Sequence, residues 1–213
     1  MIGSKDIVAL FDFDGVVMDT ESQYSTFWNA KGKEYYPEIE DFGNRIKGQT
    51  LTQICNKYFD DNFQRRIIDE LDLFESNMNF EYIPGALSFI KELKAKGVKI
   101  GIVTSSNDKK MRHVYKVHPE LLEIVDKIFT SEMFTHSKPH PDCFLCGASY
   151  FDAKVENCIV FEDSFHGLEA GRRAGMYVIG LSTTNKRDEI IDKADYVISD
   201  FNGFNYDKLI NLL

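Results

Sequence analysis

The sequence lacks the long apolar stretches that mark membrane proteins. Its longest unbroken apolar runs, such as residues 7–11, hold about five residues, whereas a membrane-spanning helix needs roughly 20. The first six residues contain no apolar targeting region, so we expect no signal peptide. The sequence therefore predicts a cytoplasmic protein that has no membrane partner.

Positive charge is also scarce. The chain has 25 Lys and Arg residues against 34 Asp and Glu residues, which gives a net charge of −9. Nucleic-acid-binding proteins usually carry a basic face, so this balance argues against a nucleic-acid partner. The aromatic content of 13% excludes disorder over the whole chain. A length of 213 residues allows one large domain, or a medium domain with a smaller one.

Cysteines are too few for a disulfide scaffold, because the chain has only four. Cys143 and Cys146 form a CxxC pair, which is compatible with zinc or redox chemistry, but no second CxxC follows. A spacing of three residues also places both thiols on one face of a helix. We interpret them as partly buried helix residues and keep the zinc or redox role as an alternative.

Short apolar runs alternate with helical patterns over most of the chain. The runs expected to form strands are 7–12, 98–104, 127–130, 157–162, 176–181 and 195–198. The helices expected between them are 86–96, 108–117, 141–151, 165–174 and 206–213. Strands that are apolar on both faces and separated by helices indicate a buried parallel sheet. We therefore predict an α/β fold with a doubly wound, Rossmann-like core.

Residues 18–81 do not follow this alternation and contain almost no strand-like runs. The helices expected there are 22–31, 51–59 and 62–78, with Pro37 and Gly43 in a connecting stretch. We therefore expect a discontinuous core domain, residues 1–17 and 82–213, with an all-helical domain of residues 18–81 inserted after the first strand. Such an insertion would cover a ligand site at the strand ends.

Acidic residues follow two of the expected strands. Asp12 and Asp14 come after the first strand, and Glu162 and Asp163 come at the end of the fourth. Ligands bind at the carboxyl ends of strands in open α/β sheets, so we expect these side chains to converge. Four carboxylates cannot crowd together as anions without a cation, and hard oxygen ligands favour Mg²⁺. The sequence thus predicts a magnesium site.

Hydroxyl groups and a lysine add a second function to this site. Thr104, Ser105 and Ser106 follow the second strand, where hydroxyls and backbone N–H groups suit the oxygens of a phosphate. Lys138 precedes a helix and would neutralise further negative charge. A carboxylate beside both metal and phosphate can act as a nucleophile, and a second carboxylate can transfer protons. This set indicates phosphoryl transfer through an aspartyl phosphate.

Four segments resemble the motifs of the haloacid dehalogenase superfamily, in the branch of phosphosugar phosphatases and β-phosphoglucomutase. They are FDFDGVVMDT at 11–20, VTSSN at 103–107, SKPHPD at 137–142 and FEDS at 161–164. Gly167, Ala170, Gly171, Ala174 and Gly175 follow the last segment as they do in the family. The resemblance covers nearly the whole chain.

The resemblance implies roles for the acidic residues. Asp12 would be the nucleophile, and Asp14 would be the general acid and base that also offers its backbone carbonyl to Mg²⁺. Asp163 would bind Mg²⁺ directly, and Glu162 directly or through water. Because the true dehalogenases lack an acid at the position of Asp14, the resemblance favours phosphoryl transfer over carbon–halogen cleavage.

The resemblance also implies how the substrate is held. Thr104, Ser105 and Ser106 would bind the phosphoryl oxygens, and Lys138 would hold Asp12 and the phosphoryl group together. The helical domain would be the family's cap, which closes over a small phosphorylated metabolite such as a sugar phosphate. We expect a monomer.

The sequence of the expected cap bears on the choice between a phosphatase and a mutase. Lys47-Gly48-Gln49 resembles the corresponding stretch of β-phosphoglucomutase, and Lys47 and Gln49 are expected to face the substrate. The mutase has an arginine where this chain has Leu51, and a histidine where it has Tyr24. A mutase must hold two phosphates at once, so the loss of the arginine favours a phosphatase. A mutase and a non-catalytic phosphate-binding protein remain the alternatives.

Overall fold

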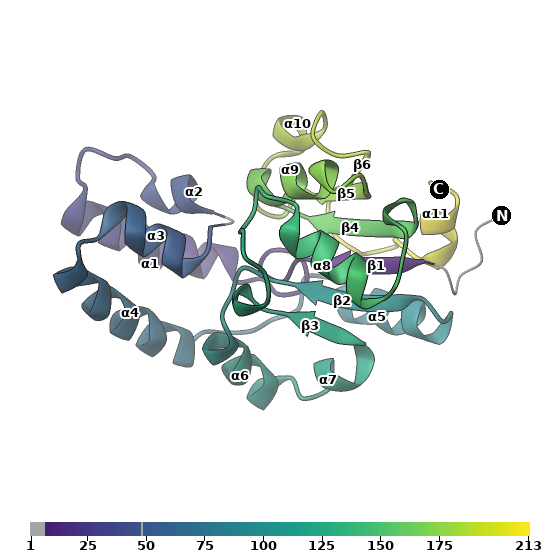
Figure 1. Cartoon of the computed structure of the whole chain (residues 1–213), viewed down its shortest axis with the longest axis horizontal. Helices are drawn as coiled ribbons and strands as arrows, with labels where there is room; N and C mark the ends of the chain where they lie inside the picture. The colour runs from purple at the N-terminus through teal and green to yellow at the C-terminus, as the bar shows by residue number, and fades with distance from the viewer. Residues whose placement is uncertain (1–6, 48) are drawn as a thin grey trace.

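A computed structural model describes residues 7–47 and 49–213 and shows one parallel sheet within them (Figure 1). Its strands are β1 (Val8–Phe11), β2 (Lys99–Val103), β3 (Lys127–Phe129), β4 (Cys158–Glu162), β5 (Tyr177–Leu181) and β6 (Tyr196–Ile198). Their order is β3-β2-β1-β4-β5-β6, and all neighbours are parallel. The chain thus builds the sheet outward from β1 in both directions, which confirms the predicted doubly wound α/β fold.

Helices cover both faces of the sheet, which explains why its strands are apolar throughout. In β1, Ala9 and Phe11 belong to one core cluster, with residues of α5, α6 and α11, whereas Val8 and Leu10 belong to a second, with residues of α8, α9 and α10. These helices are α5 (Ala86–Ala95), α6 (Asp108–Val117), α8 (Asp142–Tyr150), α9 (Phe165–Arg173), α10 (Arg187–Ile190) and α11 (Tyr206–Ile210). A short helix, α7 (Leu121–Ile124), also packs on the first side.

A helical insertion, α1 to α4, lies between β1 and α5 in the chain and beyond the carboxyl ends of the strands in space (Figure 1). Its helices are α1 (Glu21–Tyr35), α2 (Phe42–Ile46), α3 (Leu51–Tyr58) and α4 (Asp61–Ser76). Trp28, Phe42, Tyr58 and Ile67 are buried in a core of its own. The predicted insertion is therefore confirmed and is consistent with a cap.

The structure corrects the sequence interpretation within this insertion. The helix expected over 22–31 continues to Tyr35. Gly32 lies inside this helix and allows Phe42 to pack closely, because a Cβ on Gly32 would lie 2.4 Å from the Cβ of Phe42. The expected connecting stretch also contains α2. A helix of five residues is too short to show a periodic apolar pattern.

Two expectations fall partly outside the described residues. The absence of a signal peptide rests on residues 1–6, and Gly48 belongs to the stretch that resembles β-phosphoglucomutase; neither segment is among the residues that the structure describes. Within the described ranges, no helix combines the length and the apolar character needed to cross a membrane.

Candidate active site

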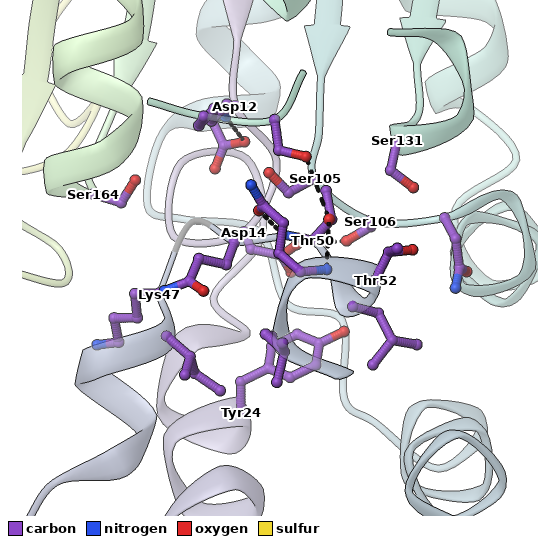
Figure 2. A pocket seen from close by; sticks show the side chains of 18 of the residues that line it. Asp12, Asp14, Tyr24, Lys47, Thr50, Thr52, Ser105, Ser106, Ser131 and Ser164 are labelled. Carbon is purple, nitrogen blue, oxygen red and sulfur yellow. Dashed lines mark hydrogen bonds and ion pairs between the residues drawn. The ribbon is translucent and has the colours of Figure 1, made fainter. Parts of the chain in front are cut away.

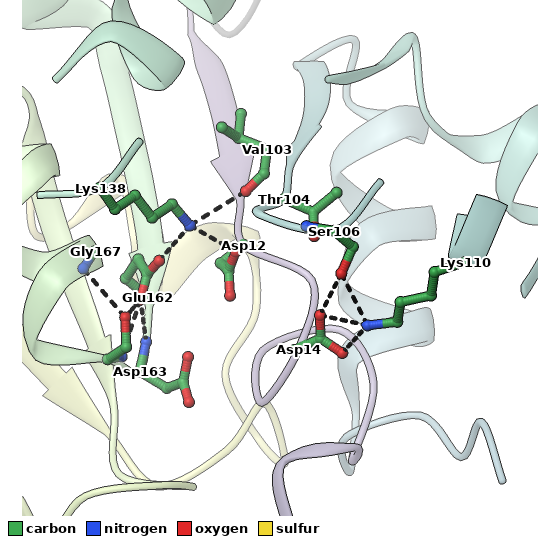
Figure 3. Close-up of polar contacts among 11 residues, drawn as sticks. Asp12, Asp14, Val103, Thr104, Ser106, Lys110, Lys138, Glu162, Asp163 and Gly167 are labelled. Atoms are coloured by element: carbon green, nitrogen blue, oxygen red, sulfur yellow. Dashed lines mark hydrogen bonds and ion pairs between the residues drawn. The ribbon is translucent and has the colours of Figure 1, made fainter. Parts of the chain in front are cut away.

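Asp12 and Lys138 form the centre of the site. Asp12 follows β1 directly, and its backbone N–H donates to the carbonyl of Phe161, which fixes the end of β1 against β4. The Lys138 ammonium donates to Asp12 Oδ1 at 2.6 Å, to Glu162 Oε1 at 2.5 Å and to the carbonyl oxygen of Val103 at 3.3 Å (Figure 3). Lys138 thereby joins the ends of three neighbouring strands, β2, β1 and β4.

Glu162 is committed to contacts within the protein on both oxygens. Oε1 accepts from Lys138, while Oε2 accepts from the backbone N–H groups of Asp163 and Ser164 at 2.9 Å each and from the Ser164 hydroxyl at 3.0 Å. The Ser164 hydroxyl in turn accepts from Gly167 N–H and caps α9. Glu162 therefore fixes both the loop that carries Asp163 and the side chain of Lys138.

Asp163 is different, because one of its oxygens has no partner. Its Oδ2 is buried and forms no hydrogen bond of normal geometry with a described residue, although the Thr184 hydroxyl lies close enough to oppose the rise in its pKa. Gly15 lies so close that a Cβ there would be 2.2 Å from this oxygen. A buried carboxylate oxygen without a partner is costly. Possible ligand oxygens of Asp12, Glu162 and Asp163 lie within 4.8 Å of one another, so this donor set fits a hard cation such as Mg²⁺.

Electrostatics point the same way. Burial raises the pKa of Asp12 to about 8, with Glu162 adding to the rise and Lys138 opposing it. Burial, together with Glu162, raises the pKa of Asp163 well above its usual range. For Lys138, burial alone would lower the pKa, but Asp12 and Glu162 raise it well above the usual range. The site thus holds more negative charge than one lysine offsets.

Asp14 lies beside this centre and is held by a residue that the sequence interpretation missed. Lys110, in α6, donates to Asp14 Oδ2 at 2.6 Å and also to Oδ1 (Figure 3). The Asp14 carboxylate accepts in addition from the hydroxyls of Thr20 and Ser106. A signal was present in the sequence: Lys110 lies one helical turn before the buried Val114, on the face of α6 that packs inward.

The expected phosphate-binding residues separate into two groups. Ser105 and Ser106 line the cavity, whereas Thr104 is fully buried and its hydroxyl accepts from Ser106 N–H at 3.0 Å. Asn107 caps α6 by accepting from Lys110 N–H. The loop after β2 therefore presents two serines to the cavity, and the contact expected of Thr104 stays a prediction.

A cavity of about 800 Å³ lies between the insertion and the strand ends (Figure 2). Asp12, Asp14, Lys138 and Asp163 line it from the core, and Lys47 and Gln49 line it from the insertion, so their contact with a substrate stays a prediction. The Ser137 hydroxyl donates to the Thr50 hydroxyl, which joins two walls of the cavity, and His166 Nδ1 lies 2.7 Å from the carbonyl oxygen of Lys47. His166 lies in the first turn of α9.

The insertion brings acidic rather than basic groups to this cavity. Burial, followed by the nearby Asp14, raises the pKa of Glu21 to about 7, and Lys47 Nζ lies 3.6 Å from its Oε2. Glu75 is buried and accepts from the Tyr24 hydroxyl at 2.7 Å. Among the described insertion residues that line the cavity, Lys47 is the single basic one. The sequence interpretation missed both glutamates.

The cysteines occupy the positions expected of helix residues. Cys143 is buried in α8 and Cys146 is half-buried. Burial raises the pKa of the Cys143 thiol to about 12. The two groups of possible metal ligands found among the described residues contain no cysteine; the second consists of His136, His140 and Asp142 at the rim of the cavity.

A doubly wound sheet whose central strand ends in a buried carboxylate–lysine pair, under a helical insertion, defines an α/β enzyme with its active site at the strand ends. The family can be stated more closely. The chain belongs to the haloacid dehalogenase-like hydrolases, whose family profile matches residues 9–181. The resemblance inferred from the motifs is confirmed, and with it the expectation of a hydrolase-type enzyme.

Individual relatives show a range of activities. The chain is 30% identical over 210 residues to the chloroplastic protein SUPPRESSOR OF QUENCHING 1 of Arabidopsis thaliana, covering 92% of this chain but only 20% of that protein. It is 30% identical over 190 residues to a probable pseudouridine-5′-phosphatase of Saccharomyces cerevisiae, covering 80% of each. It is 27% identical over 188 residues to β-phosphoglucomutase of Bacillus subtilis, covering 81% of each.

Solved structures share the fold. The crystal structure of a HAD hydrolase from Entamoeba histolytica superposes with a TM-score of 0.81 at 24% identity, covering 97% of this chain and 98% of that one.

Because one relative is chloroplastic, the cytoplasmic location of this chain stays a prediction.

Proposed function

We propose that the chain is a Mg²⁺-dependent phosphomonoesterase that acts on a small phosphorylated metabolite, in particular a sugar phosphate, through an aspartyl phosphate on Asp12. One observation carries the proposal: Asp12 lines the cavity, Lys138 donates to its carboxylate, and a carboxylate oxygen of Asp163 lies within 4.8 Å of it. The relatives that are phosphatases of phosphorylated metabolites support it.

Asp12, Asp163 and the backbone carbonyl of Asp14 would hold Mg²⁺, with Glu162 as a direct or water-mediated ligand. When bound, the ion would offset the negative charge that develops on the transferred phosphoryl group. Glu162 already contacts Lys138 and two backbone N–H groups, so its main contribution is to order the loop around Asp163.

The residues of the chain divide the reaction into two steps. In the first, an Asp12 oxygen forms a bond to phosphorus, the bond from phosphorus to the substrate oxygen breaks, and Asp14 gives a proton to that oxygen. In the second, Asp14 takes a proton from water, whose oxygen attacks phosphorus and frees Asp12 as inorganic phosphate leaves. Lys138 keeps Asp12 in place throughout, since it is buried against it.

The phosphoryl oxygens would be bound by Thr104, Ser105, Ser106 and Lys138. The leaving group would extend toward the insertion, which we propose to be a cap domain of residues 18–81, where Lys47 and Gln49 line the cavity. Burying the reaction under a cap excludes water and strengthens these contacts.

Charge at the insertion side favours a phosphatase over a mutase. A mutase must bind a second phosphate there, yet the cavity wall offers Glu21, Glu75 and the apolar Leu51, with Lys47 already beside Glu21. A leaving group with hydroxyls and no net charge fits this wall better than a second phosphate does.

The test is phosphate release from a panel of phosphorylated sugars, polyols and nucleosides, with Mg²⁺ and with EDTA. We expect release from a subset of sugar phosphates, loss with EDTA, and loss in Asp12→Asn. No release from any member contradicts the proposal. Conversion of glucose 1-phosphate to glucose 6-phosphate in the presence of a sugar bisphosphate, without net phosphate release, would establish the mutase instead.

A further inference from the structure

We propose that Lys110 is a positioning residue for the acid–base carboxylate of Asp14, which it holds from behind the active site. The inference rests on the proposed function, because it assigns a role in the proton transfers of that reaction. It adds a residue from α6 that lies outside the four motifs noted in the sequence.

The hydrogen bonds of Lys110 all lead to Asp14, either directly or through Ser106. Its ammonium donates to both carboxylate oxygens of Asp14 and, at 2.9 Å, to the hydroxyl of Ser106, which itself donates to Asp14 at 3.0 Å (Figure 3). An ammonium has three N–H donors, so this set uses all of them. A two-point grip fixes the carboxylate plane as well as its position.

Lys110 is enclosed on its other sides. The side chain is 1% exposed, and its ammonium lies 5.3 Å from the ring centre of Phe13 and 4.6 Å from that of Tyr24. The Tyr24 hydroxyl is tied to Glu75 across the insertion. A buried ammonium in this setting has a strong preference for a charged partner, and Asp14 is the one it contacts.

The contacts with Lys110 and Thr20 still allow Asp14 to exchange one hydrogen-bond partner, Ser106. A carboxylate has about four lone-pair sites, which here accept from Lys110 twice, from Thr20 and from Ser106. Lys110 and Thr20 do not line the cavity, whereas Ser106 does. A substrate oxygen or a water in the cavity can therefore replace the Ser106 contact while the buried pair keeps Asp14 in orientation.

Orientation of this kind matters for rate rather than for binding. A misplacement of about 1 Å at a reacting group can lower a rate about 10²-fold. Because Lys110 does not line the cavity, its loss should leave substrate affinity nearly unchanged. We expect Lys110→Met to lower kcat for an alkyl phosphate 10- to 100-fold with little change in KM.

A substrate whose leaving group needs no proton can distinguish loss of acid positioning from a general structural effect of the variant. p-Nitrophenolate leaves without needing a proton, so Lys110→Met should still form the phosphoenzyme from p-nitrophenyl phosphate at nearly the wild-type rate. Hydrolysis of that phosphoenzyme needs Asp14 as a base and should be slow. A pre-steady-state burst of about one nitrophenolate per enzyme is therefore expected in the variant, as slow second steps produce.

Lys116→Met is the matched control, since Lys116 lies exposed on the same helix and should leave both steps unchanged. A second comparison distinguishes loss of positioning from poor folding of Lys110→Met. In an Asp14→Asn background the carboxylate that Lys110 positions is absent, so adding Lys110→Met should cause no further loss of activity.

Two results would overturn the inference: no nitrophenolate burst when Lys110→Met reacts with p-nitrophenyl phosphate, or a further loss of activity when Lys110→Met is added to Asp14→Asn. A wild-type chain that releases no phosphate would instead refute the proposed function itself, so the two failures can be told apart.

Discussion

Gly167 lies directly against the carboxylate of Glu162. A Cβ added to Gly167 would fall 1.8 Å from Oε1 and 2.3 Å from Oε2, too close for either atom to stay in place. The first turn of α9 thus closes over the carboxylate that holds Lys138. Any side chain at this position must push Glu162 away from the lysine.

We predict that Gly167→Ala lowers activity at least 10-fold and reduces the thermal stability of the protein. The displaced Glu162 would loosen Lys138, and Lys138 would loosen Asp12. Gly203→Ala is the control: no atom lies within 4 Å of a Cβ added to Gly203, so this variant introduces only the backbone strain of its positive φ of 68° and no close contact. Activity of Gly167→Ala equal to that of the control would show that the close approach has no consequence.

Replacement of Lys138 should cost stability as well as activity. Lys138→Met leaves Asp12 and Glu162 buried without their common cation, and breaking a buried pair from one side typically costs about 3–5 kcal/mol. Urea unfolding of the metal-free protein measures this loss. Adding Glu162→Gln to Lys138→Met should restore part of the stability and none of the activity. A double variant no more stable than the single one would contradict this account.

The effect of Asp163→Asn should change sign with the metal. Without Mg²⁺ the variant removes a buried carboxyl group whose ionisation is disfavoured by burial, and it should unfold at a higher temperature than the wild type. With Mg²⁺ at about 100 times its dissociation constant, binding adds about 2.7 kcal/mol to the wild type, which the variant should largely lose. Thermal unfolding with EDTA and with Mg²⁺ gives both comparisons. The same ranking in both conditions would argue against Asp163 as a ligand.

The sequence predicted those parts of the site that follow directly from a strand. Asp12, Ser105 and Asp163 come within a few residues of strand ends, and the rule that parallel strands end together brings them to one edge. Lys110 was missed because a lysine is usually exposed, and only its position one turn before Val114 contradicts that expectation. Glu21 was missed because its burial depends on how the insertion packs against the core, which local patterns do not encode.

A pH-dependent contribution to stability is predicted away from the site. Asp126 accepts from Lys94 at 2.6 Å and from the backbone N–H of Ile100 at 2.8 Å. Burial alone would raise the pKa of Asp126, but these two contacts hold it below its usual value. The stabilisation is therefore present above the unfolded-state pKa of about 4 and is lost as the pH falls through the lower folded-state pKa.

The matching variant is Asp126→Asn. At pH 7 it should lose about 1 kcal/mol of unfolding free energy, since Lys94 is partly exposed and solvent screens the pair. Urea unfolding at pH 7 and pH 3 should show the variant and the wild type converging at the lower pH. A gap of constant size would mean that the charge of Asp126 does not matter.

The position of β1 in the sheet has a consequence for the chain during its synthesis. Val8 pairs with Lys99 on one side and with Cys158 on the other, so β1 emerges from the ribosome long before either neighbour exists. Until β4 is made, the backbone N–H and C=O groups along one edge of this apolar strand have no partner strand, which leaves it open to aggregation. Asp12, the proposed nucleophile at the end of β1, likewise has no contact with Lys138 and Glu162 until those residues are made, so the growing chain cannot yet complete the site.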